Sequence, residues 1–239
     1  MQTRLFRSLL LACAAASVCT PPAFAQPTLS VSFGHFMLRH HRSAADIFRI
    51  EHHDLAIEAG DFNGLSLGGE LLVPVPLRAA LGTFEAGVGA SYSSRTVAAT
   101  HSRVFNPDGS PIHRTLGHSQ LPLALTVRWL PLGHPYRVQP YAGGGLALIR
   151  FHVLESGDFA ARGTLFRDER YETTRTAVGP VVVVGLRVVS DRLALGVEGR
   201  HQTARGSFAP VFARVRDAEI DLHGWTLNGT IGLRLGRRP

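Results

Sequence analysis

Histidine is the residue type in this chain with the clearest capacity for chemistry, because a neutral imidazole is a common metal ligand. Seven of the 12 histidines fall in two polar stretches of the sequence. Asp46 and Asp54 lie near the paired histidines of the first stretch, so zinc or copper binding is one interpretation. The spacing fits no defined metal site, and we expect no metal ion and no cofactor. The seven are His40, His41, His52, His53, His101, His113 and His118.

A run of three glycines, Gly143 to Gly145, is the other candidate for ligand chemistry. Glycine-rich loops hold phosphate when a helix begins directly after them. The residues from Leu146 onward have a strand-like pattern instead. We therefore interpret the run as small residues in a crowded, tightly twisted strand.

The elements that would position such residues are strands. In Leu193–Thr203, the residues Leu195 and Val197 share one face, whereas Glu198 and Arg200 occupy the other. This period of two is typical of a strand with one apolar and one polar face. Eight segments of this kind follow one another: Leu29–Phe36, Leu65–Val73, Thr83–Ser93, Gln120–Leu130, Pro140–His152, Thr176–Val189, Leu193–Thr203 and Leu222–Leu235.

The connections between these segments alternate in length. Those after the second, fourth and sixth segments are short, whereas those after the first, third, fifth and seventh are polar and run about 18 to 28 residues. Membrane barrels of the bacterial outer membrane have even strand numbers, short inner turns and long outer loops. The sequence therefore predicts an all-β fold, an eight-stranded antiparallel up-and-down transmembrane barrel with four long outer loops.

Charged residues on the inward face of these segments are expected to form one network. Glu85 and Arg128 lie at similar depth on neighbouring segments, with Glu70, Arg187 and Arg234 at nearby depth. Eight strands enclose a lumen that side chains can fill, and buried charges there must compensate one another. The expected result is a plug, built from Glu70, Glu85, Arg128, Arg187, Glu198, Arg200 and Arg234.

Aromatic residues near the segment ends predict two girdles at the membrane boundaries. Phe84, Trp129 and Tyr141 lie beside the short turns. Tyr92, Phe151 and Trp225 lie beside the long loops.

The first 25 residues have the features of a cleaved export signal. Arg4 and Arg7 precede a short apolar run, and Ala23-Phe24-Ala25 is a small-residue cleavage site. The barrel domain would then occupy residues 26–239, without cysteine and with 23 arginines against 18 acidic residues, a net charge of +5. These arginines are scattered, which argues against nucleic acid as a partner.

Many of the arginines fall in the long connections, where lipopolysaccharide phosphates would meet them. Outer-membrane lipids and lipopolysaccharide are therefore the expected partners of a monomer. The arginines concerned are Arg39, Arg42, Arg49, Arg103, Arg114, Arg162, Arg167, Arg170, Arg175, Arg205, Arg214 and Arg216.

These features, with the Pro140–Leu146 opening of the fifth segment, resemble the small outer-membrane barrels of the OmpA, OmpX and OmpW kind. The resemblance covers the chain after the signal and implies a structural or surface-interaction role, with insertion by the export and barrel-assembly machinery. Such barrels usually end in an aromatic residue, whereas this chain ends Leu235-Gly236-Arg237-Arg238-Pro239.

Two alternatives remain open. Part of the chain resembles the PagL-like lipid A deacylases, whose His-x-Ser-Asn motif corresponds to His201-Gln202-Thr203-Ala204 here. That resemblance implies Thr203 as a nucleophile activated by His201, with Glu219 or Asp221 as the acidic partner, although Ala204 departs from the motif. We expect that the protein is not an enzyme, and we keep the lipid A deacylase as an alternative. The other alternative is a soluble exported barrel that carries an apolar ligand.

Overall fold

The computed structural model describes residues 26–39, 55, 57–78, 82–106, 108–161, 164–208 and 218–235. The expected export signal, residues 1–25, lies outside the described residues. Within those ranges, no helix has the length and apolar character needed to cross a membrane. The elements are β1 (Thr28–Leu38), the 3-10 helix η2 (Ala59–Phe62), β2 (Gly64–Arg78), β3 (Thr83–Phe105), β4 (Pro111–Leu130), β5 (Val138–Ala161), β6 (Thr164–Val189), β7 (Leu193–Gln202), β8 (Arg205–Phe208), β9 (Ala218–Asp221) and β10 (Gly224–Arg234).

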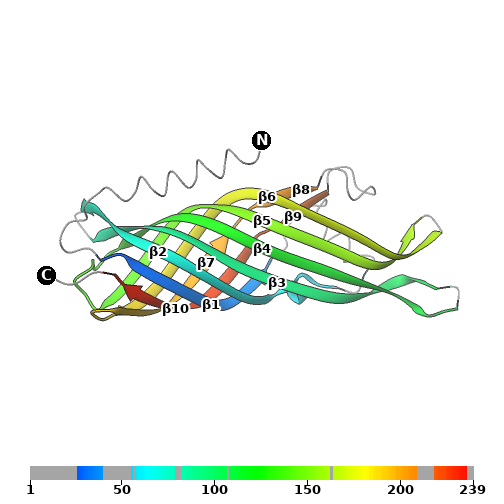
Figure 1. The fold of residues 1–239 in the computed structure, drawn as a ribbon, viewed down its shortest axis with the longest axis horizontal. Helices are drawn as coiled ribbons and strands as arrows, with labels where there is room; N and C mark the ends of the chain where they lie inside the picture. The colour runs from blue at the N-terminus through cyan, green and yellow to red at the C-terminus, as the bar shows by residue number, and fades with distance from the viewer. Residues whose placement is uncertain are drawn as a thin grey trace.

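Eight of these strands close into an antiparallel barrel in the order β1, β10, β7, β6, β5, β4, β3, β2 (Figure 1). The ring closes where β1 pairs with β10, with Leu29 opposite Leu233. β8 and β9 pair with each other in a separate small sheet. Each barrel strand overlaps one of the eight segments, so the predicted fold class is confirmed.

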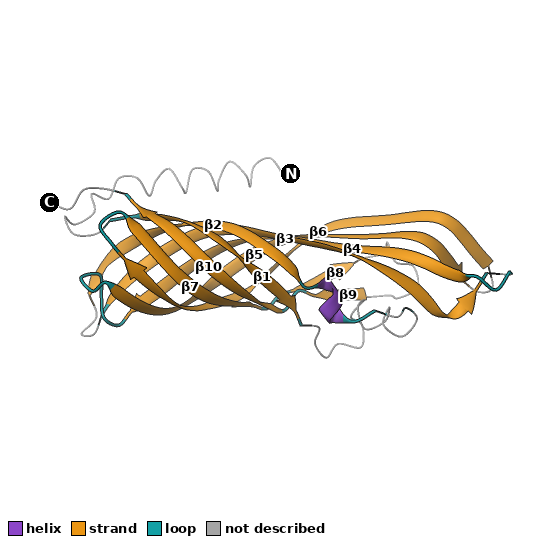
Figure 2. Ribbon diagram, turned by 90° about the horizontal axis from the view of Figure 1, so that it is seen from below, coloured by secondary structure: helices purple, strands orange, loops and turns teal. Residues whose placement is uncertain are grey.

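Four neighbouring strands, β3 to β6, are much longer than the rest and continue beyond the barrel as a four-stranded sheet (Figure 2). We call this sheet the extension; it comprises residues 94–105, 111–119, 150–161 and 164–176. The prediction of long loops after the third and fifth segments is wrong. Those residues pair with each other, for example Thr100 with His113 and Leu154 with Glu172, and so satisfy their backbone groups as strand.

The outer face of the barrel carries a band of exposed apolar side chains. Leu65, Leu125, Val178 and Leu227 are each more than 60% exposed. Exposed apolar surface of this extent is unfavourable in water, and around a closed barrel it is the surface that faces lipid. The fold is therefore that of a membrane barrel.

Four of the six predicted girdle aromatics lie on the outward face. Phe84 and Trp129 are paired across β3 and β4 near the short turns. Tyr92 and Trp225 are 51% and 43% exposed near the other boundary of the band. The sequence missed Tyr136, which is 59% exposed in the turn after β4.

The girdle prediction is wrong for Tyr141 and Phe151, which are only 4% and 0% exposed. The odd-numbered positions of β5 face the lumen, and its outward positions are occupied by Leu146 and Leu148. Position near a strand end suggested an interface, but the alternation of the strand decides which face a side chain occupies.

The lumen holds two layers. A charged layer fills the half near the short turns, and an apolar layer fills the half toward the extension. The apolar layer includes Phe151 and Ile149 of β5, which pack with residues from the outer connections, namely Leu55, Ile57, Phe62, Ile220 and Leu222. Gly206 of β8 permits close approach, because a Cβ there would lie 2.3 Å from the Phe151 ring. The chain thus fills its own barrel mouth.

Candidate functional site

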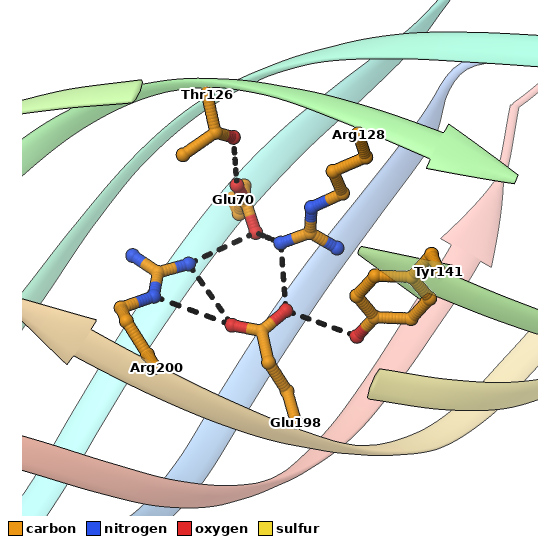
Figure 3. Close-up of polar contacts among 6 residues, drawn as sticks. All are labelled: Glu70, Thr126, Arg128, Tyr141, Glu198 and Arg200. Carbon is orange, nitrogen blue, oxygen red and sulfur yellow. Dashed lines mark hydrogen bonds and ion pairs between the residues drawn. The ribbon is translucent and has the colours of Figure 1, made fainter. Parts of the chain in front are cut away.

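The charged layer is centred on Arg128 of β4. Its guanidinium forms ion pairs with Glu70 of β2 and, at 2.7 Å, with Glu198 of β7 (Figure 3). Arg200 of β7 contacts the same two carboxylates, at 3.4 Å and 3.1 Å. Thr126 also donates a hydrogen bond to Glu70, at 3.2 Å. Two arginines and two glutamates therefore compensate one another and connect three strands across the lumen.

Tyr141 of β5 extends this group toward the short turns. Its hydroxyl donates a hydrogen bond of 3.0 Å to Glu198, and its ring lies 4.8 Å from the Arg128 guanidinium (Figure 3). The Arg187 guanidinium lies 5.9 Å from the same ring. Tyr141 packs directly over Gly185, where a Cβ would lie 2.4 Å from the phenol.

A second charged group lies nearer to the short turns. Glu85 of β3 forms an ion pair with Arg187 of β6 at 2.6 Å and contacts His134 Nε2 at 3.0 Å. The side chain of Gln139 accepts a hydrogen bond from Arg187 at 2.8 Å. Its amide donates to the backbone carbonyls of His134 and Tyr136. The turn after β4 is thereby tied to this end of the lumen.

Six of the seven predicted interior charges lie in these two groups. Arg234 does not, because its guanidinium donates to the backbone carbonyl of Ser190 at the barrel end. The six form two groups of ion pairs where one network was expected: Glu85 and Arg128 are opposite in register, but the short ion pairs of each run to other strands. Two adjacent side chains project into the lumen side by side, and their long ends reach partners across it.

Sequence reasoning missed the neutral and turn members of the charged layer, Tyr141, Gln139 and His134. Tyr141 and Gln139 share the inward face of β5 with Ala147, so strict alternation counted back from Ala147 finds both. No local signal in the sequence places His134 in the lumen.

A cavity of about 30 Å³ lies within the charged layer, bordered by Glu70, Tyr141, Glu198 and small side chains of β1 and β10. Such a space holds about two water molecules and is too small for a substrate. The layer therefore acts by compensating charge and joining strands.

A second group of side chains lies at the outer edge of the apolar band, and we call it the rim cluster: His201, Thr203, Asp221, His223 and Trp225. The His223 ring lies between the side chains of Thr203 and His201. Its Nδ1 is 3.1 Å from Thr203 Oγ1, and its Nε2 is 3.2 Å from His201 Nε2. His201 also contacts the Trp225 ring, with centroids 4.6 Å apart. Sequence reasoning missed His223, which lies outside the motif that drew attention to His201.

The rim cluster does not form the arrangement that the deacylase resemblance implies. The imidazole beside the Thr203 hydroxyl is that of His223, and its other nitrogen faces His201. In a catalytic triad that nitrogen faces a carboxylate. Asp221 accepts a hydrogen bond from the backbone N–H of His223, and Glu219 lies on β9 in register with Ser207.

The predicted histidine stretches are only partly described. His40, His41, His52 and His53 lie outside the described residues, and His101, His113 and His118 lie on β3 and β4. Across the described ranges, no three side chains of histidine, cysteine, aspartate or glutamate gather into a metal site.

A polar patch occupies the outward face of the extension just above the apolar band. Arg150 of β5 is exposed two residues beyond Leu148 and lies opposite Leu121 and Thr176. His152 is the next outward residue and lies between Ser119 and Thr174 in register. We call this group the outer patch: Arg150, His152, Ser119, Thr174 and Thr176.

One predicted surface arginine lies elsewhere. Arg114 of β4 is 5% exposed on the inward face of the extension and forms an ion pair with Glu155 at 2.8 Å. Its Nε also donates to the backbone carbonyl of Asp158 at 3.1 Å. The expectation that Arg114 contributes to an outer basic surface is therefore wrong.

The fold and the charged lumen define a small eight-stranded membrane barrel. The solved structures similar to the chain include three outer-surface or membrane barrel proteins. The Neisserial surface protein A has a TM-score of 0.43 and 11% sequence identity, over 88% of this chain and 97% of that one. The N-terminal β-barrel domain of Pseudomonas aeruginosa OprF has a TM-score of 0.37 and 10% identity, over 88% of this chain and 99% of that one. The attachment invasion locus protein Ail of Yersinia pestis, solved with the heparin analogue sucrose octasulfate, has a TM-score of 0.40 and 9% identity, over 88% of this chain and 99% of that one. The sequence matches no protein-family model and no curated protein.

Proposed function

We propose that this chain is an outer-membrane barrel with a structural and surface-interaction role, in which the outer patch contacts the phosphate groups of lipopolysaccharide. The position of Arg150 carries the proposal. Arg150 is exposed two residues beyond the outward-facing Leu148 and opposite Leu121, at the level where polar head groups replace hydrocarbon.

The chemistry of the outer patch suits a phosphate. A guanidinium forms paired hydrogen bonds with phosphate oxygens, and the hydroxyls of Ser119, Thr174 and Thr176 are donors on neighbouring strands. Glu172, on the same strand as Thr174 and Thr176, is engaged by His152 at 2.9 Å and by Arg170 at 3.1 Å. The hydrogen bond with His152, and after it the one with Arg170, lowers the pKa of Glu172. The carboxylate therefore stays ionised beside them.

The filled lumen supports this role over the alternatives. Transport of a solute needs a continuous path, whereas both layers of the lumen are packed. A soluble carrier needs an apolar interior space and a polar exterior, and the described barrel has the opposite exterior. Export and barrel-assembly machinery are proposed as transient partners during biogenesis.

The membrane placement is tested by electrophoresis of the protein from an outer-membrane fraction, unheated and boiled. A closed barrel resists unheated SDS, so its mobility is expected to change on boiling. A protein found in the soluble fraction, with one mobility under both conditions, would contradict the membrane assignment and favour the ligand carrier.

The lipid contact is tested by comparing Arg150→Ala with Arg192→Ala, which removes an exposed arginine at the opposite end of the barrel. One arginine near an anionic lipid surface contributes about 1 kcal/mol. We therefore expect Arg150→Ala to weaken lipopolysaccharide binding about fivefold, with little effect of Arg192→Ala. Equal binding by both variants would rule out the outer patch as the contact.

A further inference from the structure

The rim cluster brings two imidazole nitrogens together at the outer edge of the apolar band, with Nε2 of His201 and Nε2 of His223 3.2 Å apart. We propose that these two histidines form a binding site for a divalent transition-metal ion, Zn²⁺ or Cu²⁺. The site is separate from the outer patch and does not depend on lipopolysaccharide binding.

The separation of the two nitrogens fits one shared ion. Zinc binds imidazole nitrogen at about 2.0 to 2.1 Å with tetrahedral angles, which places two such ligands about 3.3 Å apart. The two Nε2 atoms are already within a few tenths of an ångström of that distance. The rings are nearly perpendicular, at 83°, so they do not stack on each other.

Thr203 provides the support that a metal-binding histidine usually has. Such a histidine donates its second ring N–H to a neighbouring acceptor, which fixes the tautomer that leaves the other nitrogen free. Nδ1 of His223 lies 3.1 Å from Thr203 Oγ1, and with the proton on Nδ1 the lone pair of Nε2 can bind the ion. Without metal, one proton between the two Nε2 atoms accounts for their contact, so the ion and the proton compete.

The backbone holds the two histidines in place. His201 lies on β7 opposite Trp225 of β10, and the backbone N–H of His223 is fixed by Asp221 at 3.1 Å. Both imidazoles are only half-buried, so an ion can enter from outside the barrel. Two coordination positions remain for water or other oxygen donors, which makes the site open and exchangeable.

Trp225 provides a local reporter, because its ring touches His201. The chain has two tryptophans, and Trp129→Phe leaves Trp225 as the only one. The experiment is a titration of the folded full-length Trp129→Phe protein in detergent with Cu²⁺, followed by tryptophan fluorescence. We expect saturable quenching that Zn²⁺ reverses by competition.

Substitution at the rim cluster should remove this response. In the same background, His223→Ala and His201→Ala are expected to lose saturable quenching, and Thr203→Val is expected to weaken the affinity about tenfold through loss of the orienting contact. Heat-dependent mobility of each variant verifies that the barrel has folded.

The matched controls keep His201 and His223 and replace histidines outside the rim cluster. His113→Ala, and a variant with His40, His41, His52 and His53 all changed to alanine, should quench like the parent. Quenching that survives in both His201→Ala and His223→Ala would overturn the proposal. Ester hydrolysis by the metal-free protein, abolished by Thr203→Val and unaffected by Zn²⁺, would assign the cluster to nucleophilic catalysis and would also overturn it.

Discussion

Glu198 of β7 and Arg128 of β4 form an ion pair of 2.7 Å across the lumen, with β5 and β6 between their strands in the ring. Both side chains are 3% exposed. Because water is excluded, each charge depends on its partner for compensation. The barrel is therefore held together by contacts through its centre as well as by the hydrogen bonds around its wall.

Replacement of Glu198 by glutamine should destabilise the barrel strongly. Glu198→Gln leaves Arg128 and Arg200 with only Glu70 as a carboxylate partner in this group, and an uncompensated buried charge costs about 3 to 5 kcal/mol. Equilibrium unfolding in guanidinium chloride, in detergent or lipid, measures the loss in the free energy of unfolding.

The control for this variant is Glu172→Gln on the extension. Glu172 also pairs with an arginine and a histidine, but its side chain is 49% exposed. Exposed ion pairs contribute about 0 to 1 kcal/mol, so the loss should be small. Equal losses in the two variants would show that burial of the Glu198 pair has no energetic consequence.

Removal of the Tyr141 hydroxyl should have an intermediate effect. Tyr141→Phe keeps the ring beside Arg128 and Arg187 but removes the hydrogen bond to Glu198. A hydrogen bond to a charged group contributes about 1.5 to 3 kcal/mol, and unfolding measurements should show a loss in that range.

A second variant reaches the same contact from the neighbouring strand β6, where Gly185 is in register with Tyr141. Gly185→Ala places a methyl group where the Tyr141 phenol lies and should displace it. If Tyr141→Phe and Gly185→Ala act through one contact, their effects will be less than additive in the double variant. Full additivity would contradict the shared contact.

Much of this architecture follows from alternation in the sequence. The eight strands and the inward placement of Glu70, Arg128 and Glu198 follow from a period of two, since one face must meet lipid and the other the lumen. The extension does not follow, because its buried apolar residues, such as Leu116 and Val153, stand among many polar and charged residues and the stretches resemble loops. The rim cluster joins Thr203 to His223 across a connection, and no local pattern encodes such proximity.

The packed lumen predicts that the barrel does not conduct ions as an open pore. The charged layer encloses only about 30 Å³, and the apolar layer covers it on the side of the extension. Purified protein in a planar lipid bilayer should show no stable single-channel steps. The triple variant Glu70→Ala, Arg128→Ala, Glu198→Ala, which removes three of the six predicted charges in that layer, serves as the comparison for leakage through it.

His118 predicts a particular dependence of stability on pH. It lies on β4 in the extension, beyond the apolar band, and is 4% exposed. Burial, followed by the nearby charge of His152, lowers the pKa of His118 to about 4. The folded chain therefore favours neutral His118, whereas an unfolded chain takes up a proton near pH 6.5.

The sign of the effect follows from this difference. Above about pH 6.5, His118 is neutral in both the folded and the unfolded state and has no pH-dependent effect on stability. As the pH falls from 6.5 to about 4, His118 takes up a proton in the unfolded state only, so the free energy of unfolding decreases. The loss attributable to His118 is about 3 kcal/mol at the lower limit. Unfolding curves at pH 7.5 and 4.5 should thus show a smaller acid-induced loss in His118→Leu than in the parent. His113→Leu, at an exposed position of the same strand, should keep the parent's dependence, and an unchanged slope in His118→Leu would show that His118 is protonated in the folded barrel.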